Sequence, residues 1–323
     1  MGLLSGATFG TSGSLASSLI KAGWSPGAAV TLRLTIAALV LTAPAILQLR
    51  ARPLTWASAR TVLLYGLMAI AVAQLCYFIA LSHLSVAVAL LIECSGILLV
   101  VAWGWIRYSN RPRRLTAVAV LTSLAGLVLV LDLTGPQKVD LVGALWALGA
   151  AVGLATYFIV TAESENVASP LVLAWGGLAV GAVALAVAGF SGVVPFRASS
   201  GDVMLLGGRV PWIIPVLGLA IVASVVSYLT GIVAVRQLGS KLASFLGLTE
   251  VLFAVLFAWL LLDQHLAAPQ LVGASLVVAG IALVRLDESE MAAPSTTQPR
   301  VDDAPFADVG FVAPDQLRRV RGR

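Results

Sequence analysis

Long apolar runs dominate the chain, and they can be cut at charges, prolines and turn residues into segments of helical membrane-spanning length. A helix needs about 20 apolar residues to cross a hydrocarbon core of ~30 Å. Transmembrane β-strands would be runs of ~10 residues that alternate apolar and polar side chains, and these segments do not alternate. The runs therefore predict an all-α membrane protein with ten transmembrane helices, at residues 3–20, 27–47, 61–82, 86–106, 115–133, 141–161, 170–190, 211–235, 242–262 and 267–285.

The composition excludes several classes of protein. Apolar residues make up 59% of the 323 residues and charged residues only 11%, whereas a soluble domain carries about 25% charged residues. The net charge of +5 does not indicate a nucleic-acid partner, because the basic residues lie in short connectors and in the C-terminal tail. Two cysteines and two histidines provide neither a disulfide framework nor a metal site. The phosphate loop and the hydrolase and zinc-protease motifs are also missing, so we expect no enzyme and no cofactor.

The basic residues of the connectors are unevenly distributed between the two sides of the predicted bundle. Lys and Arg accumulate in cytoplasmic connectors. The uneven distribution predicts a multi-pass protein of the inner or plasma membrane, with both termini in the cytoplasm. The nine residues assigned to the cytoplasm are Arg50, Arg52, Arg60, Arg107, Arg111, Arg113, Arg114, Arg236 and Lys241, and the four assigned to the outside are Lys21, Lys138, Arg197 and Arg209.

The second half of the chain repeats features of the first. A shift of 154 residues, the difference between Gly126 and Gly280, places Ala80 on Ala234 and Ser95 on Thr249. We therefore predict one repeat at 1–133 and another at 141–286, each with five spans. Two copies of an odd number of spans lie in opposite orientations in the membrane, which is typical of alternating-access carriers. Residues 287–323 are polar, and their composition predicts a disordered cytoplasmic tail.

The residues also resemble a known family. The stretch 238–262 (LGSKLASFLGLTEVLFAVLFAWLLL), with Gly273 and the stretch 278–280 (VAG), is similar to the second repeat of EamA-type transporters of the drug/metabolite transporter superfamily. In the first half the resemblance rests on Phe9-Gly10, Arg33 with Ala37-Ala38, and 92–96 (IECSG). It implies a secondary transporter, in most members an exporter of amino acids, metabolites or toxic compounds, often driven by protons. The family often has proline where this chain has Ile97 and Val251, which puts a kink of these two helices in doubt.

Three ionisable residues lie well inside the predicted spans, namely Arg33, Glu93 and Glu250. A charge near the bilayer centre costs at least ~2.5–3.5 kcal/mol, so such groups usually face the bundle interior or a water-filled path. Burial makes a carboxyl group hold its proton, and a nearby arginine makes it release the proton. Our hypothesis is that Glu250, with Glu93 as a second candidate, carries a proton during transport. The alternative is structural: similar depth permits a fixed ion pair between Arg33 and Glu93, and Glu250 would bind neighbouring polar groups.

Other polar residues of the spans are candidates for a substrate cavity. Each has an alternative interpretation as a helix-to-helix contact. The candidates are Gln74, Tyr77, Tyr157, Tyr228 and Ser14. Ser14 belongs to a series of small residues that recurs every four positions from Gly2 to Ser18, and tight packing is the other interpretation of that series.

We therefore predict a secondary transporter that exports a small metabolite or amino-acid-like solute by alternating access, with proton coupling as a hypothesis. A drug-efflux or uptake member of the same superfamily is the first alternative. A membrane scaffold or receptor is the alternative from another class. The residues leave open whether the protein acts as a monomer or as a homodimer.

Overall fold

The computed structural model describes residues 1–81, 83–84, 86–108, 113–131, 140–205, 207–262 and 268–292. Most of them are helical, and two stretches of π-helix are continuous with the α-helices beside them. The elements are α1 (Gly2–Lys21), α2 (Pro26–Ala51), α3 (Trp56–Leu64), η1 (Tyr65–Val72), α4 (Ala73–Leu81), α5 (Val86–Cys94), α6 (Gly96–Tyr108), α7 (Arg114–Val130), α8 (Leu141–Glu163), α9 (Pro170–Phe190), β1 (Val203–Leu205), β2 (Gly208–Val210), α10 (Ile213–Leu217), η2 (Gly218–Val226), α11 (Ser227–Gly247), α12 (Thr249–Leu262) and α13 (Ala268–Ala292).

Seven helical stretches of the described residues are long and apolar enough to cross a membrane. The other predicted spans fall on α1, on the shorter apolar helix α7, and on the end of α11 with α12. The all-α membrane class is therefore confirmed, and the count of ten spans stays a prediction. The seven stretches are Pro26–Ala51, Trp56–Tyr77, Val88–Tyr108, Leu141–Glu163, Pro170–Phe190, Ile213–Gly247 and Ala268–Asp287.

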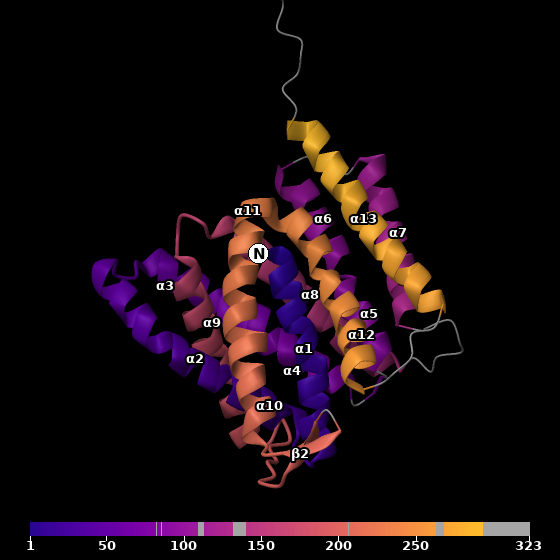
Figure 1. Cartoon of the computed structure of the whole chain (residues 1–323). Coiled ribbons are helices and arrows are strands. Elements are labelled where there is room, and N and C mark those ends of the chain that lie inside the picture. Colours follow the sequence, from indigo (N-terminus) through magenta and orange to yellow (C-terminus); the bar gives the residue numbers. More distant parts are fainter. Residues whose placement is uncertain are drawn as a thin grey trace, which may run out of the picture.

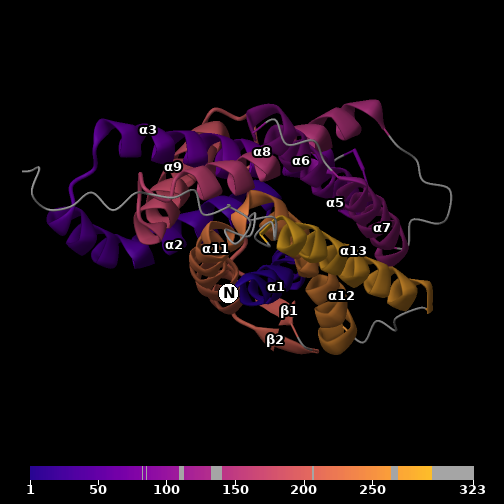
Figure 2. The same ribbon diagram turned by 90° about the horizontal axis from the view of Figure 1, so that it is seen from above.

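The helices form a broad bundle in which α2, α3 and α9 lie on one side and α7 and α13 on the other, with α1, α8, α11 and α12 between them (Figures 1 and 2). The start of α1 and the end of α13 both lie away from the β1–β2 hairpin, which caps the opposite end (Figure 1). The hairpin pairs Val203 with Val210 in antiparallel register. The connector before it is attached to α2, because Ser25 Oγ accepts a hydrogen bond of 2.9 Å from the backbone N–H of Arg197.

Helices that correspond in the two predicted repeats make similar contacts. Helix α1 packs on η2, α11 and α12, and α8, its counterpart in the second half, packs on η1, α4, α5 and α6. Equivalent helices of the two halves also contact each other, α2 with α9 and α7 with α13, and α9 packs on η1 as α2 packs on η2. Such a pattern is consistent with two related halves. Their opposite orientation in the membrane stays a prediction.

Local features recur at equivalent positions as well. Ser25 and Ser169 each precede a proline at the first position of a helix, and each hydroxyl accepts a hydrogen bond from a backbone N–H, that of Ala28 at 3.3 Å and that of Val172 at 3.2 Å. Side-chain caps of this kind satisfy donors that the first turn leaves free. The stretch η1 begins at Tyr65 and η2 at Gly218, close to the shift of 154 residues.

The fourth and ninth predicted spans are interrupted although both lack proline. Helices α5 and α6 separate at Ser95, and α11 and α12 separate at Leu248. At both breaks a hydroxyl donates to the carbonyl three residues earlier, from Ser95 to Ile92 at 2.5 Å and from Thr249 to Leu246 at 2.6 Å. Hydroxyl groups and tight turns therefore interrupt these two helices where proline is missing.

The helix α13 continues beyond the predicted boundary of the tail. It ends at Ala292, and Asp287, expected to be the first disordered residue, is helical and 1% exposed. The predicted boundary at 287 is wrong because this polar residue has buried partners that the sequence does not reveal. Residues 293–323 lie outside the described part of the chain.

Candidate functional site

A cavity of about 380 Å³ lies inside the bundle and is lined by helices from both halves of the chain. The structure brings to it seven of the eight residues that the sequence singles out. They are Arg33, Glu93, Glu250, Gln74, Tyr77, Tyr157 and Tyr228. Because they come from six helical elements, α2, α4, α5, α8, α11 and α12, only the folded bundle places them together.

Close packing of α1 against α12 determines where Glu250 lies. A Cβ atom added at Gly10 would be 2.8 Å from Cβ of Phe253 and 3.1 Å from the carbonyl oxygen of Glu250. These distances are shorter than ordinary carbon contacts, so glycine is needed for the two backbones to touch. Glu250 lies in the first turn of α12, where the free N–H groups and the helix dipole favour a negative charge.

Glu93 lies at the other interrupted helix, in the last turn of α5 and just before the break at Ser95. The helix that follows is held close to α8, since a Cβ atom added at Gly96 would lie 2.6 Å from the carbonyl oxygen of Ala151. Glu93 interacts electrostatically with Glu250, and Tyr77 interacts with both acids. The two carboxyl groups therefore share one site.

Arg33 is the basic group that lines this cavity, and it is only 6% exposed. Its guanidinium interacts electrostatically with Tyr228 and Glu250. The acidic neighbour of Arg33 is therefore Glu250, and the salt bridges of the described residues do not include a pair with Glu93, the partner proposed from depth. Within the described part of the chain, the Nε atom of Arg33 has no hydrogen-bond partner. With all three groups ionised the site would carry one net negative charge, so it can take up a proton or a cationic group.

Aromatic rings form one wall of the cavity. The ring centroids of Phe9 and Tyr228 are 5.1 Å apart with an edge-on geometry, and those of Tyr157 and Tyr228 are 6.1 Å apart. Phe158 packs edge-on against Tyr157 at 5.0 Å. Such rings offer an apolar surface and, at their faces, a weak attraction for cations. Sequence reasoning passed over Phe158 as a cavity residue, and its position next to Tyr157 was the one available signal.

Ser14 is not among the residues that line the cavity, whereas Ser5 and Ser12 of the same helix are. Neighbouring residues of a helix are rotated by about 100°. Ser14 therefore points about 200° away from Ser12, toward a different side of α1. The small residues of α1 serve both the cavity and packing: Gly2, Gly6 and Gly10 line the cavity. Gly6 also approaches Thr249 closely, and Ser5 Oγ donates to the carbonyl of Ser227 at 3.0 Å.

The site combines groups that can carry charge, but its described residues do not form a metal centre. No group of three or more His, Cys, Asp and Glu side chains within the described ranges could hold a metal ion. The combination of one guanidinium, two carboxyl groups and an aromatic wall instead suits a small solute that carries its own charges.

Comparison with known proteins identifies a family, a curated relative and solved structures to which the chain is similar. The model of the EamA-like transporter family matches residues 1–132 and 141–286. The uncharacterized inner membrane transporter YicL of Salmonella typhimurium is 24% identical over 234 residues, which are 72% of this chain and 75% of that protein. A solved crystal structure superposes with a TM-score of 0.72 at 20% identity, covering 90% of this chain and 96% of the other. The last match shows a shared fold.

Proposed function

The chain belongs to the EamA-like transporter family, and from this premise we propose that it exports a small metabolite or amino-acid-like solute by proton-coupled secondary transport. The observation that carries the proposal is the position of Arg33, Glu93 and Glu250 around one cavity inside the bundle, where Arg33 is buried and the two acids are half-buried. Charges in hydrocarbon are costly. A scaffold or receptor has no use for three of them at one cavity, whereas a carrier can use them to bind its solute.

The cavity chemistry fits an amino-acid-like solute. A guanidinium forms paired hydrogen bonds with a carboxylate, so Arg33 is suited to the acidic group of a zwitterion. A glutamate is suited to its ammonium group, and the wall of Phe9, Tyr157 and Tyr228 is suited to an apolar side chain. The direction of transport, export, is taken from the family.

Glu250 is our candidate for the proton carrier. It follows the break at Leu248 and has Arg33 as an electrostatic neighbour. A small movement of the head of α12 would change both its access to water and its distance from the guanidinium. Both changes alter how tightly a carboxyl group holds its proton, so a proton taken up in one conformation would be released in the other.

The architecture that we propose for this cycle is a pair of inverted repeats with ten spans and cytoplasmic termini. It is supported by the similar contacts of corresponding helices in the two halves and by the equivalent breaks at Ser95 and Leu248. It is also supported by the start of α1 and the end of α13, which lie toward the same end of the bundle (Figure 1). The relative YicL is named as an inner membrane protein, and we propose the same location for this chain.

The test uses purified protein in liposomes that contain a pH-sensitive dye. Amino acids and related solutes are added singly, and a transported solute should move protons with it. Glu250→Gln should lower this proton movement at least about tenfold, the effect of ~1.4 kcal/mol. Exchange of labelled for unlabelled solute, which needs no net proton movement, should survive.

The matched control is Glu165→Gln, the same chemical change at an exposed position between α8 and α9, which should transport as the unmodified chain does. Full proton-driven transport by Glu250→Gln would refute the role of this residue. If no amino acid or related metabolite moved protons or exchanged, the proposed solute class would be wrong.

A further inference from the structure

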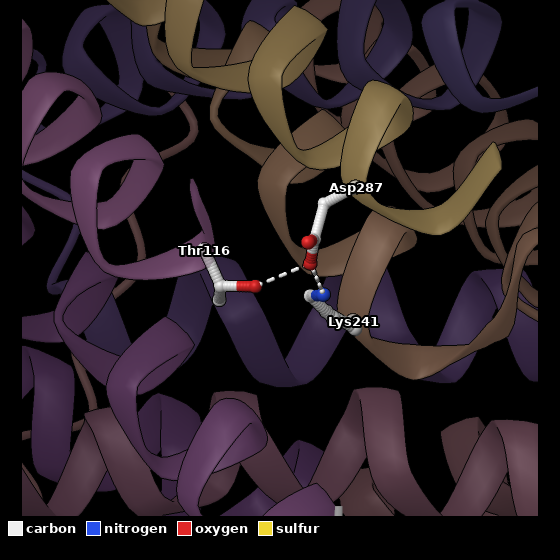
Figure 3. Close-up of polar contacts among 3 residues, drawn as sticks. All are labelled: Thr116, Lys241 and Asp287. Atoms are coloured by element: carbon white, nitrogen blue, oxygen red, sulfur yellow. Dashed lines mark hydrogen bonds and ion pairs between the residues drawn. The ribbon is translucent and has the colours of Figure 1, made fainter. Parts of the chain in front are cut away.

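Three polar side chains meet away from the cavity, where α7, α11 and α13 come together (Figure 3). Asp287 Oδ2 accepts hydrogen bonds from Lys241 Nζ at 2.6 Å and from Thr116 Oγ1 at 2.5 Å. Asp287 and Thr116 are each 1% exposed. We call Thr116, Lys241 and Asp287 the Asp287 clamp. None of the three lines the cavity, so the clamp is outside the site proposed above.

The clamp holds a short helical segment, residues 240–247, and the helix is irregular just before this segment and interrupted just after it. Before it stands Gly239, whose φ of 77° and ψ of 164° interrupt α11. After it comes the break at Leu248, followed directly by the helix of Glu250. The segment 240–247 can therefore turn as a unit about these two points. Lys241 is its second residue and attaches it to Asp287.

This segment stands between the cavity and the α7–α13 pair. Its residues Ala243, Ser244 and Gly247 line the cavity. On its other side, Leu242 and Phe245 belong to an apolar cluster with residues of α7 and α13 such as Ala119, Val277 and Val284. Any movement of the segment relative to α7 and α13 would change the shape of the cavity and the position of Glu250.

The α7–α13 pair is a firm support because its backbones touch. A Cβ atom added at Gly126 would lie 2.6 Å from the carbonyl oxygen of Gly273, and one added at Gly273 would lie 2.5 Å from that of Gly126. Small residues permit such close approach between membrane helices. Because the contact repeats along the pair at Gly280, which approaches Ala119 and Ser123, the two helices cannot slide past each other easily.

We propose that Asp287 is a positioning residue for Glu250: through Lys241 it fixes the segment 240–247 to the α7–α13 pair and so sets the place of the transport acid. This inference rests on the proposed function of Glu250. Asp287 Oδ1 is buried and lacks a hydrogen-bond partner among the described residues, so the hydrogen bonds from Lys241 and Thr116 stabilise the carboxylate through Oδ2, with Arg113 as a further charged neighbour. When Lys241 leaves, the buried carboxylate loses its hydrogen-bonded counter-ion, and the clamp therefore favours one defined position of the segment.

The test measures how accessible the segment is. Ser244 is 2% exposed and is replaced by cysteine in a chain whose Cys76 and Cys94 are alanine. The rate of its modification by N-ethylmaleimide is compared with and without the pair of changes Asp287→Asn and Lys241→Met. Removing both charges together avoids a lone buried charge, so this variant should fold, which its elution as a single species in detergent checks. The control is Arg285→Gln, a charge change at an exposed position of the same helix.

We expect the double variant to be modified at least about threefold faster than the control, within the range of coupling that contact networks carry. Proton movement driven by a panel of amino acids should show a lower maximal rate, because the position of Glu250 is no longer fixed. Restoring aspartate alone, with Lys241→Met kept, should not restore the slow rate, whereas restoring both residues should.

The outcomes separate the two proposals. If the unmodified chain moves no protons with any amino acid, the proposed function fails, while the modification rates still decide whether the clamp holds the segment. If the unmodified chain transports and the double variant matches Arg285→Gln in modification rate and in maximal rate, Asp287 has no positioning role.

Discussion

The two interrupted helices that carry the cavity acids differ in construction, although a shift of 154 residues superposes them. The first has a break at Ser95, and Glu93 precedes it. The second has an irregular residue at Gly239 and a break at Leu248, and Glu250 follows both. Glu250 therefore lies in the first turn of a helix that follows two irregular points, Gly239 and Leu248, whereas Glu93 ends a helix that is irregular at one described point.

The anchoring of the two helices differs as well. In the sequence, the positions equivalent to Lys241 and Asp287 are Ala87 and Leu133, which cannot form an ion pair. Only the second half therefore has the Lys–Asp pair of the Asp287 clamp at these equivalent positions. We infer that Glu250 is the acid whose surroundings change during transport and that Glu93 has a more constant environment.

The largest expected effect tests this difference between the two acids. Glu93→Gln should leave proton-driven transport within about tenfold of the unmodified chain, whereas Glu250→Gln should lose it by more than that factor. Glu93 still affects binding because it shares the site electrostatically. The measurement is proton movement in liposomes over a range of solute concentrations. Equal losses in the two variants would show that the acids act as an equivalent pair and would remove the distinction.

The second-largest expected effect concerns the α7–α13 pair, to which the interrupted helix of Glu250 is anchored. Gly126→Ala should lower the free energy of unfolding by about 1–3 kcal/mol, since the added methyl group would overlap backbone atoms of Gly273 and Val277. Gly104→Ala is the control, because nothing lies within 4 Å of a Cβ atom there, and the loss of backbone freedom should make it neutral or slightly stabilising. The midpoint of thermal unfolding in detergent measures both. A Gly126→Ala midpoint equal to that of the control would mean that the α7–α13 contact is loose.

The general architecture could be predicted from the sequence because membrane insertion leaves a strong pattern. Apolar runs marked the helices, and the rarity of buried charge singled out Arg33, Glu93 and Glu250, which the fold brings to one cavity. The periodicity of α1 alone could not decide which of its faces meets the cavity. Ser14 and Ser12 are both small hydroxyl residues, and only the packing of α1 against α12 separates their roles.

The Asp287 clamp and the breaks could not be predicted because they depend on contacts between distant segments. In the sequence, Asp287 has the polar character of the tail that follows it. Its burial depends on Thr116 and Lys241, which lie 171 and 46 residues away in the chain. Likewise, Ser95 and Thr249 are common residue types in membrane helices, so their turns carry no distinctive signature.

The smallest expected effects compare the irregular points of the two helices directly. Gly239→Ala should destabilise the protein by at least about 1 kcal/mol, because its φ of 77° and ψ of 164° lie in a region that residues other than glycine rarely adopt. Nothing lies within 4 Å of a Cβ atom at Gly239, so the cost would come from the backbone and not from a clash. Ser95→Ala removes a hydroxyl bond to Ile92 and should cost about 0.5 kcal/mol, the low end for a hydrogen bond.

Thermal unfolding in detergent again gives the two values, with Gly104→Ala as the common control. The two variants should also differ in their effect on the modification rate of a cysteine at position 244. Gly239→Ala should change this rate, because a regular helix at 239 would redirect the segment 240–247. Ser95→Ala should leave the rate unchanged. If both variants left that rate unchanged while Gly239→Ala lost stability, the irregular glycine would be a structural feature of α11 and not a hinge for the helix of Glu250.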